Sequence, residues 1–323
     1  MARIAKNFFP VVTLAWSLAC GAQTYPTKPI RLVVPYPPGA FLDVVARLVT
    51  PSLGASLGQP VVADNRPGAG ESLGAELVAR SAPDGYTLLV CSVNGMVFRP
   101  ALAKNVPYDP VKDFTPLIEA LRGSVGLVAN DSVPARTMAE LIAYAKANPG
   151  KASYGTAGIG TSGHLIGEQL QRLTGAELVH VPYKSAAQPL QEVMAGQIPV
   201  AYANVGTIAA QIKSGRFHVL ATSGATRNRQ LPDVPTISEV VPEFKLIPSW
   251  TGMVAPAGLP APLVARLSDE MRKAFTSPAV KGKIESMGFD VWAGDPQEFA
   301  ASIRRDVQTV RDIAAAAKIP PLE

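Results

Sequence analysis

Residues 153–173 read SYGTAGIGTSGHLIGEQLQRL. Residues 153–157 form a short run of small and apolar side chains that predicts a strand, and the amphipathic segment 164–173 predicts a helix. The glycine-rich residues 158–163 lie between the two and permit a tight turn. A strand, a turn and a helix in this order form the repeating unit of open α/β sheets, so the stretch predicts an α/β fold.

The turn 158–163 matches G-x-G-x-x-G, the pattern of dinucleotide-binding sites. Such a site needs an acid at the end of the next strand, about 20 residues further on. Residues 180–184, HVPYK, stand there without an acid, which argues against a dinucleotide. The amides at a helix N-terminus still attract anions such as carboxylates, and Thr161 and Ser162 add hydroxyl donors. A tight turn without a ligand is the alternative.

A second strand-to-helix turn lies at residues 35–43, PYPPGAFLD. Ligands of open α/β sheets bind beside the carboxyl ends of strands. We therefore expect the two turns to face each other and to hold one carboxylate from both sides. Asp43 has three alternative roles, which are to cap the helix, to hold a water or to pair with a cation, and capping is the simplest interpretation.

Strands and helices alternate along the chain in two series. The first has expected strands at 30–34, 61–63 and 86–91 and helices at 42–49, which Pro51 should end or kink, and 72–80. The second has expected strands at 125–129, 153–157, 178–181, 200–203 and 217–222 and helices at 138–147 (with a capping box from Thr137 to Glu140), 164–173, 189–195 and 207–213. Residues 231–248 are expected to be irregular, followed by a strand at 250–254 and helices at 262–275 and 296–315.

The length of the chain, roughly 300 residues after export, fits two domains better than one. The last helices are too few to form a third core, so we expect them to return to the first domain. The predicted division is lobe 1, residues 23–123 and 249–323, and lobe 2, residues 124–248. Two chain crossings between the lobes would permit hinge closure around a ligand.

The N-terminus has the layout of a secretory signal peptide, residues 1–22. Arg3 and Lys6 precede an apolar run at 8–18, which is too short to span a bilayer, and small residues follow it. We expect cleavage near Ala22, and the signal peptide predicts that the mature protein lies in the periplasm. Lipidation at Cys20 is the alternative.

The composition is that of a globular protein, with 47% apolar and 17% charged residues and a formal net charge of +5. The basic residues are scattered, which argues against a nucleic-acid partner. His164, His180 and His218 lack metal-ligand spacing, and no acid completes a hydrolase triad, so no metal, no cofactor and no enzyme is indicated. Cys91 lies in an apolar run and is interpreted as a buried hydrophobic residue.

Eight short motifs occur in order along the chain. They are YPTKPI at 25–30, PPG with Asp43 at 37–43, NRPGAG at 65–70, PDGYTLL at 83–89, YDPVKDF at 108–114, HVPYK at 180–184, LPDVPT at 231–236 and APAG at 255–258. On these motifs the sequence resembles the substrate-binding proteins of tripartite tricarboxylate transporters, the Bug-type family. The resemblance spans the mature chain.

This resemblance implies a two-lobed type II periplasmic-binding-protein fold, in which each lobe is a mostly parallel sheet flanked by helices and the ligand lies in the interlobe cleft. It implies that the protein, expected to be a monomer, delivers a small carboxylate to membrane permease subunits. The alternative is a periplasmic sensor that presents its closed form to a signalling receptor.

The ligand carboxylate is expected at the two turns. The resemblance carries this role to Gly39, Ala40 and Asp43 in lobe 1 and to Gly158, Gly160, Thr161 and His164 in lobe 2. The expected ligand-binding set also includes Phe41, Ser92, Asn94, Arg99, Ile159 and Asn204.

Several residues depart from the family pattern. Ala40 and Phe41 follow Gly39, where the family usually has a second glycine, Glu71 replaces an expected glycine and Arg99 replaces an expected asparagine. Arg99 either binds a second ligand carboxylate in bidentate fashion or points to solvent.

The apolar side chains of Phe41, Met96 and Phe98 suggest a fairly apolar pocket. Such a pocket would favour an aromatic or aliphatic mono- or dicarboxylate over citrate. Core packing of the same three residues is the alternative.

Overall fold

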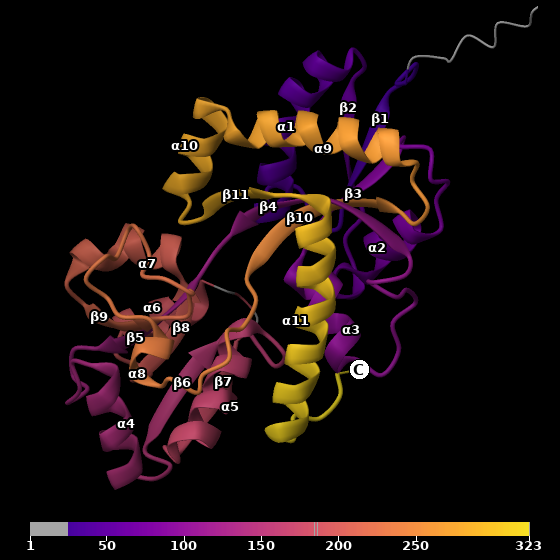
Figure 1. Cartoon of the computed structure of the whole chain (residues 1–323). Coiled ribbons are helices and arrows are strands. Elements are labelled where there is room, and N and C mark those ends of the chain that lie inside the picture. The colour runs from indigo at the N-terminus through magenta and orange to yellow at the C-terminus, as the bar shows by residue number, and fades with distance from the viewer. Residues whose placement is uncertain (1–24, 184, 186, 323) are drawn as a thin grey trace, which may run out of the picture.

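The computed structural model describes residues 25–183, 185 and 187–322, which form two β-sheets flanked by helices (Figure 1). The expected signal peptide, residues 1–22, lies outside the described residues. The first sheet has the order β11-β4-β10-β3-β1-β2 and the second the order β7-β6-β8-β5-β9. We call the first sheet with its helices lobe 1 and the second with its helices lobe 2.

The strands of lobe 1 are β1 (Ile30–Val34), β2 (Val61–Asn65), β3 (Thr87–Ser92), β4 (Phe114–Arg122), β10 (Trp250–Pro256) and β11 (Asp290–Gly294). Those of lobe 2 are β5 (Val125–Asn130), β6 (Ala152–Thr156), β7 (Leu178–Pro182), β8 (Val200–Asn204) and β9 (Phe217–Thr222). Each strand expected from the sequence is present, with ends that shift by at most two residues.

Both sheets are mixed. In lobe 1, β1 is parallel to β2 and β3, whereas β10 is antiparallel to β3 and β4. In lobe 2, β6 is parallel to β7 and β8, whereas β5 is antiparallel to β8 and β9. The two-lobed α/β architecture is confirmed, and most strands of each sheet run in one direction as expected: among the described strands, β10 and β11 in lobe 1 and β5 in lobe 2 run the opposite way. The antiparallel strands β5 and β10 each enter from the other lobe, without the crossover helix that parallel neighbours need.

The helices are α1 (Phe41–Leu57), α2 (Ser72–Ala79), α3 (Arg99–Leu102), α4 (Met138–Ala147), α5 (Ser162–Thr174), α6 (Gln188–Met194), α7 (Val205–Gln211), α8 (Ile237–Val240), α9 (Ala261–Thr276), α10 (Pro278–Ser286) and α11 (Pro296–Ala316). The capping box of Thr137 and Glu140 at the start of α4 is confirmed. Short helix α8 lies in the stretch expected to be irregular, and α3 and α10 were not expected.

The two faces of the lobe 1 sheet bury different residues. Leu32 and Val34 pack in the cluster that includes α1 and α9, while Val33 packs in the cluster that includes α11. This is the alternation that a strand buried on both faces requires. Figure 1 shows α1 and α9 on one side of the sheet and α11, in yellow, on the other. The C-terminal third therefore returns to the first sheet, and the boundaries at 123/124 and 248/249 stay a prediction.

Helix α1 continues through Pro51 to Leu57, so of the two expectations for Pro51 the end of the helix is wrong, and the kink stays a prediction. Leu53 and Leu57 extend the buried stripe of the helix by two more turns, while Pro51 lies on the exposed face. Their burial outweighs the one backbone hydrogen bond that the proline removes. Gly58, in the left-handed conformation, ends the helix.

Strand β4 was missed because two residues interrupt its apolar pattern. Pro116 lies next to a shift in the register between β4 and β10, where a strand tolerates proline. Glu119 is buried, and its charge is paired with Arg122 at 2.5 Å between Oε1 and Nε. A central strand with a proline and a buried acid is not recognisable from hydrophobic alternation alone.

Glycines allow the lobes to touch at backbone distance. An added Cβ on Gly206, at the start of α7, would lie 2.0 Å from the backbone oxygen of Met287, and one on Gly288 would lie 2.3 Å from the Cα of Gly206. Arg229 of lobe 2 adds ion pairs across the same contact, at 2.9 Å to Glu285 and 2.9 Å to Asp290. The chain connections also adjoin each other, since the N–H of Gly123 donates to the carbonyl of Ser249 at 2.8 Å.

Replacing Gly206 by alanine should push the lobes apart, because the new methyl group would overlap the backbone of Met287. We expect an unfolding free energy lower by about 1–3 kcal/mol and a larger radius of gyration in small-angle scattering. Gly282→Ala is the control, because its Cβ would meet nothing within 4 Å. A Gly206→Ala protein with unchanged scattering and melting temperature would contradict this prediction.

Candidate functional site

The strand registers bring the expected residues of each lobe to the sheet edge that faces the other lobe. Since β1 and β3 are parallel, the turn after β1 lies at the same edge as Ser92, which ends β3 and pairs with Thr251. In lobe 2, Asn204 ends β8 and pairs with Val125. Thr251 and Val125 both lie just after a connection between the lobes, so both edges meet at the interlobe junction.

Asp43 holds the turn after β1. Gly39, with φ of +82°, donates its backbone N–H to Asp43 Oδ2 at 2.9 Å. Asp43 also accepts from Asn65 Nδ2 at 2.8 Å and from Arg47 Nε at 2.9 Å. Hydrogen bonding to Arg47 lowers the pKa of the Asp43 carboxyl to about 2. Of the three roles considered, pairing with a cation is the one observed, because the N-cap of α1 is Ala40, without a side-chain cap.

Phe41 lies at the junction, whereas Met96 and Phe98 do not line a pocket. The ring of Phe41 stacks on Phe289 with centroids 4.2 Å apart. An added Cβ on Gly123, at the connection between the lobes, would lie 2.7 Å from the Phe289 ring. Met96 and Phe98 are 0% and 3% exposed and belong to the hydrophobic core, so core packing is the correct interpretation of these two.

Ser92 and Asn94 belong to a hydrogen-bond network with Glu71. Ser92 Oγ donates to Glu71 Oε1 at 2.5 Å, and the backbone N–H of Asn94 donates to Ser92 Oγ at 3.1 Å. Asn94 Nδ2 in turn donates to Tyr36 Oη at 3.1 Å. The network joins the ends of β1 and β3 to the loop before α2.

The lobe 2 turn is held by its own residues. Thr161, the N-cap of α5, donates from Oγ1 to the carbonyl of Gly158 at 2.7 Å. The N–H of Gly160 donates to Nδ1 of the buried His164 at 3.2 Å. Gly158 and Gly160 have φ of +122° and +78°, values that glycine adopts without strain. Thr161 and His164 thus fix the turn from both of its ends.

The first turn of α5 presents backbone donors at the junction. The hydrogen bond from Leu165 N to Thr161 O is the first of the i→i−4 series in this helix. The amides of residues 162–164 precede it and have no acceptor inside the helix. They carry the partial positive charge of the helix N-terminus and suit a carboxylate or another anion.

Residues behind the turn hold it in place, and sequence reasoning missed this role. Thr156 Oγ1 accepts from Gly158 N at 3.2 Å and lies 2.7 Å from His180 Nε2. The rings of His180 and His164 have centroids 4.4 Å apart. Burial lowers the pKa of His164, and burial together with His164 lowers the pKa of His180 to about 4. These contacts depend on the register that pairs β6 with β7, which the sequence alone does not give.

The other expected residues surround the two turns. Ile159 is 50% exposed at the tip of the lobe 2 turn, and Asn204 is the N-cap of α7 without a capping side-chain bond. Arg99 begins α3, and its side chain is half-buried against Gly70, where an added Cβ would lie 3.1 Å from its Cδ. Both alternatives for Arg99, a bidentate contact with a ligand carboxylate and a direction toward solvent, stay predictions.

The C-terminal segment of lobe 1 covers the lobe 2 turn, which the sequence did not indicate. Leu322 N donates to Leu102 O at 2.8 Å, and Leu322 O accepts from Lys104 N at 3.2 Å. An added Cβ on Gly160 would lie 2.8 Å from the Leu322 side chain and 3.4 Å from that of Leu102. The turn therefore contacts lobe 1 directly, and a side chain at position 160 would disturb that contact.

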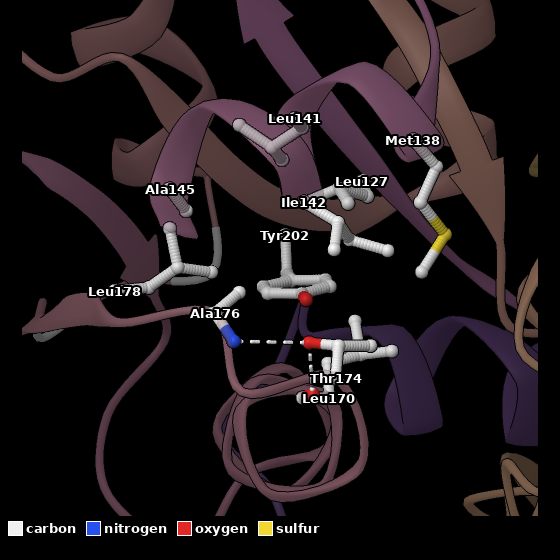
Figure 2. Close-up of a pocket in the computed structure, with 10 residues that line it drawn as sticks. All are labelled: Leu127, Met138, Leu141, Ile142, Ala145, Leu170, Thr174, Ala176, Leu178 and Tyr202. Carbon is white, nitrogen blue, oxygen red and sulfur yellow. Dashed lines mark hydrogen bonds between the residues drawn. The ribbon is translucent and has the colours of Figure 1, made fainter. Parts of the chain in front are cut away.

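The small pocket inside lobe 2 does not suit a solute. Figure 2 shows its apolar lining between α4 and α5, with the hydroxyl of Tyr202 reaching toward Thr174 and Leu170. Its free space of about 10 Å³ corresponds to about one water molecule. The junction of the lobes, and not this pocket, is the candidate site.

The part of the chain that the structure describes offers no cluster of three or more His, Cys, Asp or Glu side chains suited to a metal ion. Among the same residues, no helix combines the length and the apolar character that crossing a membrane requires. Cys91 is buried, and burial raises the pKa of its thiol. The interpretation of Cys91 as a core residue is therefore confirmed.

Comparison with known proteins identifies relatives over nearly the whole chain. A UPF0065 protein of Bordetella bronchiseptica is 36% identical over 96% of this chain and 92% of its own length. The structure of Rpa4515 from R. palustris with adipate is 31% identical, with a TM-score of 0.78 over 92% of this chain and 100% of that one. MatC from Rhodopseudomonas palustris with bound malate is 29% identical, with a TM-score of 0.73 over 90% and 99%.

The similar structures confirm the two-lobed periplasmic-binding-protein fold. Residues 45–318 also match the family described as "Tripartite tricarboxylate transporter family receptor", whose members are periplasmic substrate-binding proteins and not enzymes. The resemblance noted from eight short motifs is thereby confirmed. The chain belongs to the tripartite tricarboxylate transporter receptor family.

Proposed function

We propose that this protein captures a small carboxylate at the junction of its lobes and delivers it to the permease subunits of a tripartite tricarboxylate-type transporter. The observation that carries the proposal is the turn 158–161, which is fixed by Thr161 and His164, contacts Leu322 of lobe 1 and precedes the helix amides of residues 162–164. The known ligands of two relatives, adipate and malate, are both carboxylates and support this ligand class.

Binding requires no rearrangement inside the lobe 2 turn. The hydroxyl of Thr161 is directed at Gly158 O, and the Gly160 amide is directed at His164, so both groups hold the turn in shape. The ligand carboxylate is then left to the amides of 162–164, whose donors point along the helix axis. Since these donors are already ordered, little entropy is lost when the anion binds.

The lobe 1 turn closes over the same ligand. Gly39 and Ala40 expose backbone next to α1, and the stacked pair of Phe41 and Phe289 adds an apolar surface at the connection between the lobes. Hinge motion at the connections, including that of Gly123 with Ser249, would bring the two turns together. Export to the periplasm by residues 1–22 and action as a monomer belong to the same proposal.

A panel of organic acids tests the ligand class. The chain from Gln23 is screened by thermal shift against aromatic, aliphatic and tricarboxylic acids. An acid present at 100 times its dissociation constant adds about 2.7 kcal/mol, which corresponds to roughly 5–10 °C for lobes of this size. A flat response to the whole panel would contradict a carboxylate ligand.

Thr161→Val should weaken binding of the acid found in that panel. The substitution keeps the shape of the side chain and removes the hydrogen bond to Gly158 O. Loss of one such bond costs about 0.5–1.5 kcal/mol, so titration calorimetry should show an affinity lower by roughly 2- to 13-fold. Thr161→Ser retains the hydroxyl and is the control. Equal losses in the two variants would show that the hydroxyl is not responsible.

Acid should destabilise the lobe 2 turn. The folded-state pKa values of His164 and His180 lie below the ordinary value of 6.5. The two histidines therefore bind protons more readily in the unfolded chain. Their contribution to the free energy of unfolding is complete above pH 6.5 and falls as the pH drops toward about 4, the pKa of His180.

The loss amounts to at most about 1.4 kcal/mol per pH unit for each histidine. Melting temperatures measured between pH 7.5 and pH 5 should decline. His180→Gln, which keeps a partner for Thr156 and does not titrate, should show a shallower decline. A decline of the same slope in this variant would exclude His180 as its source.

A further inference from the structure

Glu71 combines an unusual backbone with unusual burial. It follows Ala69 and Gly70 in a run of positive φ angles, and its own φ is +78°. Non-glycine residues rarely adopt this conformation, and where they do the strain is often tied to function. The side chain is only 3% exposed, which is rare for an acid.

Hydrogen-bond donors surround the carboxyl of Glu71. Ser92 donates from Oγ at 2.5 Å and from its backbone N at 3.3 Å. The Tyr36 hydroxyl and the Gly95 backbone also hydrogen-bond to it and oppose the effect of burial, which raises the pKa of Glu71. An added Cβ on Gly95 would lie 2.8 Å from Glu71 Oε2, so the group fills its surroundings.

The hydrogen bonds to the Glu71 carboxyl favour its ionised form, but burial outweighs them and raises its pKa. Every group around the Glu71 carboxyl donates, and an ionised carboxylate accepts hydrogen bonds and cannot donate. The donors come from the ends of β1 and β3 and from the residues that follow β3. This edge of lobe 1 faces lobe 2, as the pairing of Ser92 with Thr251 shows.

We propose that the Glu71 carboxyl group occupies a subsite on lobe 1 that would otherwise accept a ligand carboxylate, and that the ligand therefore has one carboxylate and an uncharged opposite end. The donors that would bind a second ligand carboxylate are already satisfied by Glu71. The inference rests on the proposed function and specifies which class of carboxylic acid the protein binds.

Matched acids of equal length test the proposal by titration calorimetry on the chain from Gln23. The pairs are hexanoate with adipate and 4-methylbenzoate with terephthalate. The wild-type protein should bind at least one monoacid at least tenfold more tightly than its diacid. Diacid binding as tight as monoacid binding in both pairs would overturn this inference and leave the proposed function standing, whereas binding of no acid would overturn both.

Glu71→Gly should raise the affinity for the diacid of the preferred pair at least tenfold, because it frees the donors and relieves the positive φ. Glu71→Gln is the matched control, since it keeps the volume that fills the subsite, and it should change diacid affinity less than threefold. An unchanged ratio of monoacid to diacid affinity in Glu71→Gly, or an equal gain in Glu71→Gln, would overturn the proposal. If Glu71→Gly does not fold, the ratio of monoacid to diacid affinity in the wild-type protein tests the proposal by itself.

Discussion

The hydrogen bond from the Gly160 amide to Nδ1 of His164, at 3.2 Å, is the constraint on which the candidate site depends. It requires a neutral imidazole, and burial keeps His164 in that form by lowering its pKa. It also requires glycine at position 160, because φ is +78° and Leu322 of lobe 1 lies against that position. With the turn fixed against lobe 1, the first amides of α5 lie next to the junction, and amides at a helix N-terminus are suited to bind an anion.

The two lobes differ in what they offer a ligand. Both turns leave the first helix amides without an acceptor inside the helix, since the i→i−4 series begins at Leu165 in α5 and at Val44 in α1. Other donors near the lobe 1 turn are satisfied by acidic side chains of lobe 1 itself. Asp43 accepts hydrogen bonds from Gly39, Asn65 and Arg47, and Glu71 accepts the two hydrogen bonds that Ser92 donates. Relatives with adipate and malate share the fold of this chain. The difference between the lobes therefore bears on which acids bind and not on the architecture.

Local patterns predicted much of this molecule. The apolar run at 30–34 matched β1, and the glycine turn matched the connection of β6 to α5, because both patterns depend on neighbouring residues. Strand β4 was missed because Pro116 and the ion-paired Glu119 are acceptable only beside particular partners. The contacts of His180 with Thr156 and of Leu322 with Gly160 join residues distant in sequence, and a single sequence does not reveal them.

A crystal structure of the chain from Gln23 with the acid that stabilises it most tests the central claim most directly. Our account predicts the ligand carboxylate about 3 Å from the amides of residues 162–164, with the Gly160–His164 hydrogen bond intact and the lobe 1 turn closed over the other end. A carboxylate bound to lobe 1 alone, or within lobe 2 away from residues 158–164, would contradict it.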